Sequence, residues 1–287
     1  MQKEFKSLIN RVKTYSKNIS EKRLQKVYEF AAEAHADHKR NSGDGVIAHV
    51  LETAKILSTL KVDEDTLCAA LLHEIPQYTK FTVGDIEKRF GHNIALLVSA
   101  FEKIGAVKAA KAKDENEMDI LRKMFLVMAK DLRVVLIKLA DRLHNMQTLT
   151  YLSPAKQKKI ARETMEIFVP IASRLGVYTL RSTLEDLCFK FLNEREYKNI
   201  QEQLKTLGKN RKHTIEEITG IVEDFIKELG MEATVSGRFK NTYSIYKKLK
   251  QKSKTSIDDI QDIFALRIIL KSIKAVRNPS TVRIPIR

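Results

Sequence analysis

Hydrophobic positions recur every three or four residues through most of the first 230 positions, which is the spacing of amphipathic helices. An acidic start ahead of an apolar stretch predicts a helix over 63–75, and Pro76 is expected to end it because proline lacks a backbone donor. Turn residues predict a loop at Arg40–Gly45, and Ala106–Glu117 is a linker or an exposed helix. The other expected helices cover 21–38, 47–60, 81–90, 92–104, 117–148 (one helix or two), 154–174, 178–206 and 212–229.

The pattern changes after about residue 230. Residues 234–237 and 263–270 have the pattern of strands, the second rich in branched side chains, and 243–252 between them predicts a helix. An all-α region therefore gives way to an α/β region, and the boundary is expected near Lys209–Lys212.

Composition and charge narrow the class of protein. The two cysteines exclude a disulfide framework, and the absence of a long apolar run or an apolar N-terminal segment predicts a cytoplasmic protein without a membrane span. The formal net charge is +16, and residues 237–287 alone hold 13 basic and three acidic residues. Such a segment attracts polyphosphate, either nucleic acid or a small nucleotide, or else it is a solvated basic tail.

Four residues have the chemistry of metal ligands. His49, the pair His73-Glu74 and Asp141 lie on separate expected helices among apolar neighbours, and Asp141 shares a helical face with His144 and Asn145. Buried polar groups need partners, and one divalent cation would satisfy all four side chains together. Two imidazoles and two carboxylates suit Mn²⁺, Fe²⁺ or Zn²⁺ better than Ca²⁺. The alternative is that each histidine is an ordinary hydrogen-bonded core or surface residue.

The spacing of these residues is the layout of HD-type phosphohydrolases. The segments HADHKRNSGDGVIAH, LHEIPQYT, KLADRLHNM and GRFKNTYSIYKK, within a similarity covering about 20–270, resemble the RelA/SpoT alarmone synthetase/hydrolases. The resemblance implies a mainly α protein, with a helical HD-domain phosphohydrolase fold followed by the start of an α/β nucleotidyltransferase-like synthetase domain. It implies a hydrolase domain over 1–150, a connecting helical segment over 151–210 and an incomplete synthetase domain over 211–287.

The resemblance also implies a role in the stringent response, with two activities. The HD domain uses Mn²⁺ to remove the 3′ pyrophosphate of ppGpp or pppGpp, and the synthetase domain uses Mg²⁺ to transfer pyrophosphate from ATP to GDP or GTP. The implied HD metal ligands are His49, His73, Asp141 and Glu74, the last standing where the family has Asp, and Asp262 matches a Mg²⁺ ligand. The implied substrate-binding residues are Arg40, Asn145, Thr148, Arg238, Lys240, Ser244 and Lys248.

The sequence departs from the family at the catalytic positions. Gln77 and Tyr78 stand where the family has a Glu-Asp pair. Glutamine cannot accept a proton, tyrosine is a poor base at neutral pH, and losing a general base typically costs about 10²–10⁴ in rate. The resemblance is expected to stop after Leu270, which implies a truncated synthetase domain that does not make ppGpp.

Three functions remain open at this point. The first is that of a Mn²⁺-dependent ppGpp hydrolase. The second is that of an impaired relative whose HD domain is regulatory and binds metal or nucleotide without turnover. The third is nucleic-acid binding through the basic segment, which is disfavoured because no helix-turn-helix or aromatic stacking motif accompanies it.

Overall fold

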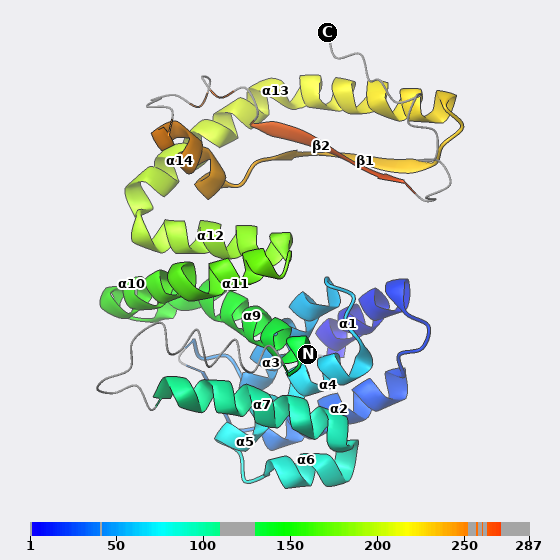
Figure 1. Ribbon diagram of the computed structural model, residues 1–287, viewed down its shortest axis with the longest axis vertical. Helices are drawn as coiled ribbons and strands as arrows, with labels where there is room; N and C mark the ends of the chain where they lie inside the picture. The colour runs from blue at the N-terminus through cyan, green and yellow to red at the C-terminus, as the bar shows by residue number, and fades with distance from the viewer. Residues whose placement is uncertain are drawn as a thin grey trace. The chain divides into compact units, whose positions relative to one another are not determined.

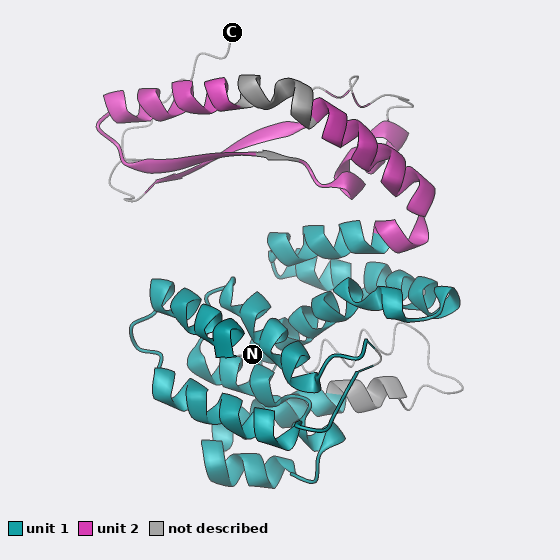
Figure 2. Ribbon diagram, turned by 180° about the vertical axis from the view of Figure 1, so that it is seen from behind, with its two compact units in different colours: residues 1–188 teal, residues 189–287 magenta. Residues whose placement is uncertain are grey.

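The structure, a computed structural model, describes residues 2–40, 42–109, 130–251, 257, 260 and 263–270, with only the backbone described at 104–109, 208–215 and 238–239. The chain forms two compact units, residues 1–188 and residues 189–287 (Figure 2). A boundary was expected near Lys209–Lys212, but the backbone passes through these residues inside one continuous helix.

The described part of the first unit is built from helices (Figure 1). This agrees with the mainly α fold expected from the periodicity. The elements are α1 Gln2–Tyr15, α2 Glu21–Ala34, α3 Val46–Ser58, α4 Glu64–Leu72, α5 Ile75–Tyr78, α6 Val83–Phe90, α7 His92–Ala109, α9 Leu132–Gln147, the 3₁₀ turn η1 Leu149–Tyr151, α10 Pro154–Glu163, the π-helical turn η2 Thr164–Phe168, α11 Val169–Arg174 and α12 Tyr178–Leu192.

Side-chain caps determine where several of these helices begin. Ser20, Asp63 and Asp131 each precede a helix and accept a hydrogen bond from a backbone N–H of its first turn. Thr82 and Asp85 form a reciprocal capping box at the start of α6. The expected helix over 81–90 therefore starts two residues late, because its first positions serve as the cap.

Helix α4 lies at the centre of the first unit. Its residues from Thr66 to Leu72 are all buried, and it packs against α2, α3, α7 and α9. A helix that is apolar on every side has to be enclosed by neighbours, and burying its side chains stabilises the fold by roughly 25 cal/mol per Å². This burial brings the end of α4, at His73, into the interior next to α3 and α9.

The expected helix ends need two corrections. Pro76 does not end the helix over 63–75: α4 already stops at Leu72, and Pro76 lies in the first turn of α5, where its missing N–H has no helical partner to lose. The helix expected over 21–38 ends at Ala34, and His35 caps it. An antiparallel bridge between Lys39 and Gly45 then closes the expected loop.

The second unit combines a long helix with a two-stranded sheet (Figure 1). Its elements are α13 Glu194–Glu228, β1 Ala233–Phe239, α14 Thr242–Gln251 and β2 Phe264–Leu270. The strands are antiparallel, with Ala233 opposite Leu270 and Phe239 opposite Phe264, so both expected strands and the helix between them are present. The helices expected over 178–206 and 212–229 are instead α12 and α13, which meet at Asn193.

Two small hydrophobic clusters lie along α13. One joins its first half to α14 through Ile200, Leu207 and Ile245, and the other joins its last turns to β1 through Val222, Ile226 and Val235. No helix in the described part of the chain is both long and apolar enough to cross a bilayer. Asp262, most of the stretch 106–117, and residues 271–287 lie outside the described residues.

Candidate metal centre

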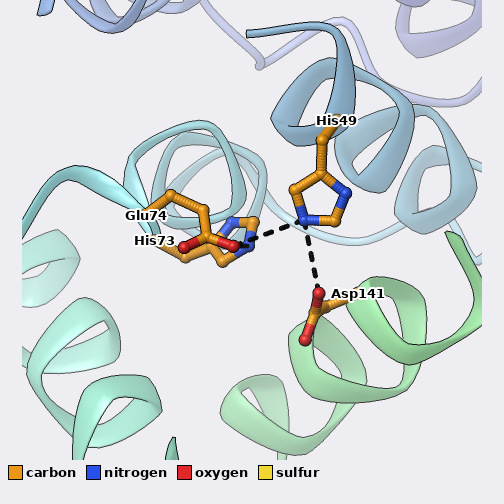
Figure 3. Close-up of side chains that lie close together, drawn as sticks. All are labelled: His49, His73, Glu74 and Asp141. Carbon is orange, nitrogen blue, oxygen red and sulfur yellow. Dashed lines mark ion pairs between the residues drawn. The ribbon is translucent and has the colours of Figure 1, made fainter. Parts of the chain in front are cut away.

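The four side chains expected to bind metal converge in the first unit (Figure 3). His49 is the fourth residue of α3, His73 caps the end of α4, Glu74 precedes α5, and Asp141 lies in the middle of α9. One nitrogen or oxygen from each lies within 4.8 Å of the others. All are buried except Glu74, which is partly buried.

The distances suit a shared ion. His49 Nε2 lies 3.3 Å from Asp141 Oδ1 and 3.5 Å from Glu74 Oε1, and His73 Nε2 lies 3.6 Å from the same Glu74 oxygen. An ion with bonds of about 2.1 Å holds neighbouring ligand atoms roughly 3.0–3.4 Å apart. The Nε2 atoms of both histidines are buried and make no hydrogen bond with any described residue. Two such atoms facing two carboxylates fit a divalent cation, which the cluster can hold.

Hydrogen bonds on the other side of each imidazole determine which nitrogen faces the cluster. His73 Nδ1 lies 2.7 Å from the carbonyl oxygen of Ala70, which can only accept, so Nδ1 carries the proton and Nε2 keeps its lone pair. His49 Nδ1 lies 2.7 Å from His144 Nδ1, and one of these two nitrogens has to donate. Burial opposes protonation of His49, but the Asp141 and Glu74 carboxylates outweigh it and raise the pKa of this imidazole, so Nε2 carries a proton unless a cation replaces it. In either state His49 Nδ1 donates and His144 Nδ1 accepts.

The charges in the site support this assignment. Burial, reinforced by nearby His49 and Arg40, lowers the pKa of His144 to about 4, so its ring is neutral and can accept a hydrogen bond. Burial opposes ionisation of Asp141, but the Lys138 ammonium group 3.0 Å away outweighs it and holds the pKa of that carboxyl well below its usual range. The pKa of Glu74 is also lowered, because the His49 and His73 rings outweigh the effect of its burial. Both carboxylates are therefore anionic.

Of the three residues expected to bind substrate in this unit, Asn145 contacts the cluster directly and Arg40 reaches it through Asn145. The Arg40 guanidinium group donates to Asn145 Oδ1, and Asn145 Nδ2 donates to Asp141 Oδ1 at 2.6 Å. Thr148 follows the end of α9, and its hydroxyl donates to the carbonyl oxygen of His144 at 3.2 Å. Arg40 and Asn145 thus form a polar chain that ends on the Asp141 oxygen next to His49.

Gln77 and Tyr78 lie in α5, directly after the cluster residue Glu74. Both side chains are exposed, and the Gln77 amide donates to the Tyr78 hydroxyl at 3.3 Å. Partial burial and the charge of Glu74 raise the pKa of Tyr78 above its usual value. The Tyr78 hydroxyl therefore stays protonated at neutral pH, and neither side chain supplies a base.

The residues expected to bind ATP belong to the second unit. Ser244 and Lys248 lie on α14, one turn apart, and Lys240 lies two residues before its start. The Lys240 backbone N–H donates to the carbonyl oxygen of Ile263 at 2.8 Å, which ties the start of α14 to the start of β2. Arg238 lies in β1, but its side chain is outside the described residues, as is Asp262.

Three residues near the cluster were not among the expected site residues. Lys138 and His144 lie three residues before and after Asp141, and this helical spacing was a usable signal. His35 gave no such signal: it is 1% exposed, and among the residues that the structure describes neither of its ring nitrogens has a hydrogen-bond partner. Burial, followed by the charge of His38, lowers the pKa of His35 to about 4.

Two protein families match parts of this chain. The HD domain family matches residues 27–178, and the region found in RelA / SpoT proteins matches residues 237–282. The second match extends beyond Leu270, so the expectation that the resemblance stops there is wrong.

Individual relatives agree with these matches. The bifunctional (p)ppGpp synthase/hydrolase SpoT of Escherichia coli is 41% identical over 266 residues, covering 93% of this chain and 38% of the relative. A GTP pyrophosphokinase of Myxococcus xanthus is 39% identical over 248 residues, covering 86% and 33%. A solved structure described as a metazoan ortholog of SpoT that hydrolyses ppGpp aligns with 63% of this chain and 98% of its own, at 24% identity and a TM-score of 0.44. The chain thus spans little more than a third of the length of the curated relatives that it matches.

Proposed function

Because this chain belongs to the RelA/SpoT family, we propose that it acts in the metabolism of ppGpp and pppGpp, as a cytoplasmic protein of the stringent response. The observation that carries the proposal is the buried cluster of two imidazoles and two carboxylates whose facing nitrogens have no hydrogen bond. We assign the HD hydrolase domain to residues 1–150, a connecting helical segment to 151–210, and part of a synthetase domain to 211–287.

In this proposal Mn²⁺ is held by His49, His73, Glu74 and Asp141. When bound, such an ion lowers the pKa of a coordinated water and polarises a phosphoryl group. Arg40, next to the cluster, binds and orients the diphosphate of the nucleotide, because a guanidinium group matches phosphate oxygens with paired donors. Asn145 and Thr148 hold the nucleotide from α9.

Turnover at this site is slow in the proposal. Gln77 and Tyr78, shortly after Glu74, stand at the positions where a carboxylate base would act. Neither side chain accepts a proton at neutral pH. The site then binds the metal ion and the alarmone well, but hydrolyses the alarmone slowly. The alternative is that turnover is lost entirely and that binding alone regulates another activity.

The test is ppGpp hydrolysis by the purified chain with Mn²⁺, following released pyrophosphate and GDP. We expect slow release that His73→Ala abolishes and that the exposed control His92→Ala leaves unchanged. Restoring carboxylates with the double variant Gln77→Glu/Tyr78→Asp is expected to raise the rate by about 10²–10⁴. No ppGpp binding to the wild-type chain, or no gain in the double variant, would refute the proposed site.

For the second unit we propose that Arg238, Lys240, Ser244 and Lys248 bind the phosphates of ATP, with Asp262 as a Mg²⁺ ligand. The support is the family match over 237–282 and the placement of Ser244 and Lys248 one turn apart on α14. Titration with ATP and Mg²⁺ tests it, since Lys248→Ala is expected to weaken binding while Lys227→Ala, on an exposed turn of α13, is not.

A further inference from the structure

A recess of about 300 Å³ opens at the start of α2. It lies away from the metal-ligand cluster, which is formed by His49, His73, Glu74 and Asp141. The recess is lined by Ser20, Lys22, Arg23, Lys26, Arg89 and Phe90. Four of the six lining residues are basic and none is acidic. A volume at the lower end of the range for small-ligand pockets indicates a small ligand, and the charge of the lining selects an anion.

Three of the cations have no counter-charge. Within the described parts of the chain Lys22, Lys26 and Arg89 make no ion pair, whereas Arg23 is paired with Glu64 at 2.8 Å and with Asp65 at 2.9 Å. Lys22 and Lys26 are four residues apart in the first two turns of α2, so they project from the same face. The positive end of the α2 dipole adds to their field.

The arginines of the recess are held in place before any ligand arrives. The Arg89 guanidinium carbon lies 4.9 Å from the centre of the Phe30 ring and 5.5 Å from that of Phe81. Arg23 donates to the carbonyl oxygen of Phe90 at 3.1 Å, which ties α2 to the end of α6. Preorganised guanidinium groups lose little side-chain entropy when they bind an anion.

The recess is distinct from the metal-ligand cluster. Glu64 and Asp65, which pair with Arg23, begin α4, whereas His73 caps its other end. The nine residues of α4 span roughly 14 Å at 1.5 Å per residue. One helix therefore separates the two sites.

We propose that this recess is a second anion site of the first unit, which binds a pyrophosphate group, either free or as the diphosphate of a nucleotide. Lys22, Lys26 and Arg89 neutralise the charge, and the guanidinium group of Arg89 donates to phosphate oxygens. The inference does not depend on hydrolysis at the metal-ligand cluster, because the two sites share no residue.

The experiment is a titration of the full chain with sodium pyrophosphate in EDTA, which removes divalent cations from the metal-ligand cluster. Binding is followed by calorimetry and by backbone amide NMR shifts. We expect shifts at Glu21–Arg23 and at Arg89, with binding weakened about tenfold by Lys22→Gln/Lys26→Gln and about fivefold by Arg89→Gln. Lys88→Gln, one residue before Arg89 and outside the recess, is the matched control and should bind as wild type.

A parallel titration with GDP distinguishes the two sources of the group. Tighter binding of GDP than of pyrophosphate assigns the recess to a nucleotide, and the reverse order assigns it to free pyrophosphate. The proposal is overturned if the amide shifts fall only in the basic second unit, if the double lysine variant and Lys88→Gln have equal affinity, or if only long polyanions such as RNA bind. Because Arg89→Gln also alters packing against Phe30, thermal unfolding of each variant confirms that the fold is retained.

Discussion

The contact between His49 and His144 leads to a prediction about metal affinity. His144→Ala removes the acceptor of the hydrogen bond from His49 Nδ1 at 2.7 Å, and leaves that N–H inside a buried site. The imidazole of His49 is then free to turn or to change tautomer, and its Nε2 lone pair no longer points reliably at the cluster.

The size of the effect follows from the burial. Leaving a buried donor without a partner costs about 1–3 kcal/mol, and loss of an outer hydrogen bond to a metal-binding histidine typically weakens metal binding 10- to 100-fold. These two ranges agree, because a tenfold loss of affinity corresponds to about 1.4 kcal/mol and a 100-fold loss to about 2.8 kcal/mol. We therefore expect Mn²⁺ affinity to fall by about 10- to 100-fold in His144→Ala.

Isothermal titration of the metal-free chain with MnCl₂ at pH 7.5 measures this affinity directly. His144→Asn is the matched variant, because its side-chain oxygen occupies nearly the position of the His144 Nδ1 acceptor and should keep affinity within about threefold of wild type. His92→Ala, an exposed histidine paired with Glu87, controls for unspecific loss of an imidazole. Wild-type affinity in His144→Ala, or equal losses in the alanine and asparagine variants, would refute the assigned hydrogen bond.

Three further predictions concern stability. The pKa of His35 is about 4 in the folded chain against 6.5 as its ordinary value, so the stability that its neutral ring contributes is complete above pH 6.5 and is lost as the pH falls toward 4. We expect the free energy of unfolding, measured by urea unfolding at pH 7 and pH 4.5, to drop by about 2 kcal/mol more in wild type than in His35→Leu. Leu71→Ala, at a fully buried position of α4, should cost about 2–5 kcal/mol, whereas Leu96→Ala, 53% exposed, should cost less than about 0.5 kcal/mol, and equal losses would contradict the central place of α4. Thr82→Ala should cost about 1 kcal/mol by removing the α6 cap while Thr82→Ser costs little, and thermal unfolding that shows no difference between them would exclude a role for the hydroxyl.

The sequence predicted that these side chains come together because they break a simple rule. His49, His73 and Asp141 are polar residues inside apolar helical stripes, and such residues need a common partner. The pairing of His49 with His144 could not be predicted in the same way. It depends on how two rings, 95 residues apart in the chain, are turned once α3 and α9 have packed.

Helix ends were predicted less well than helices. Separate helices were expected over 178–206 and 212–229, with a boundary near Lys209–Lys212, whereas α13 runs through these residues although Gly208 inside it costs about 1 kcal/mol relative to alanine. Packing outweighs that cost: Leu207 and Ile200 on one side and Val222 and Ile226 on the other are buried in separate clusters, and one helix carries both. Local propensity does not contain this information.

The continuity of α13 decides how the chain can be divided into pieces for expression. A cut at residues 209–212, where composition suggests a boundary, would leave Ile200 and Leu207 on one fragment and their partner Ile245 on the other. Both fragments would expose apolar surface and would be prone to aggregate. A cut between residues 188 and 189 falls in the last turns of α12, but it keeps the cluster around Ile245 on one fragment, because Phe189 already belongs to that cluster. A fragment that retains the metal-ligand cluster can therefore end at residue 188, before α13 begins.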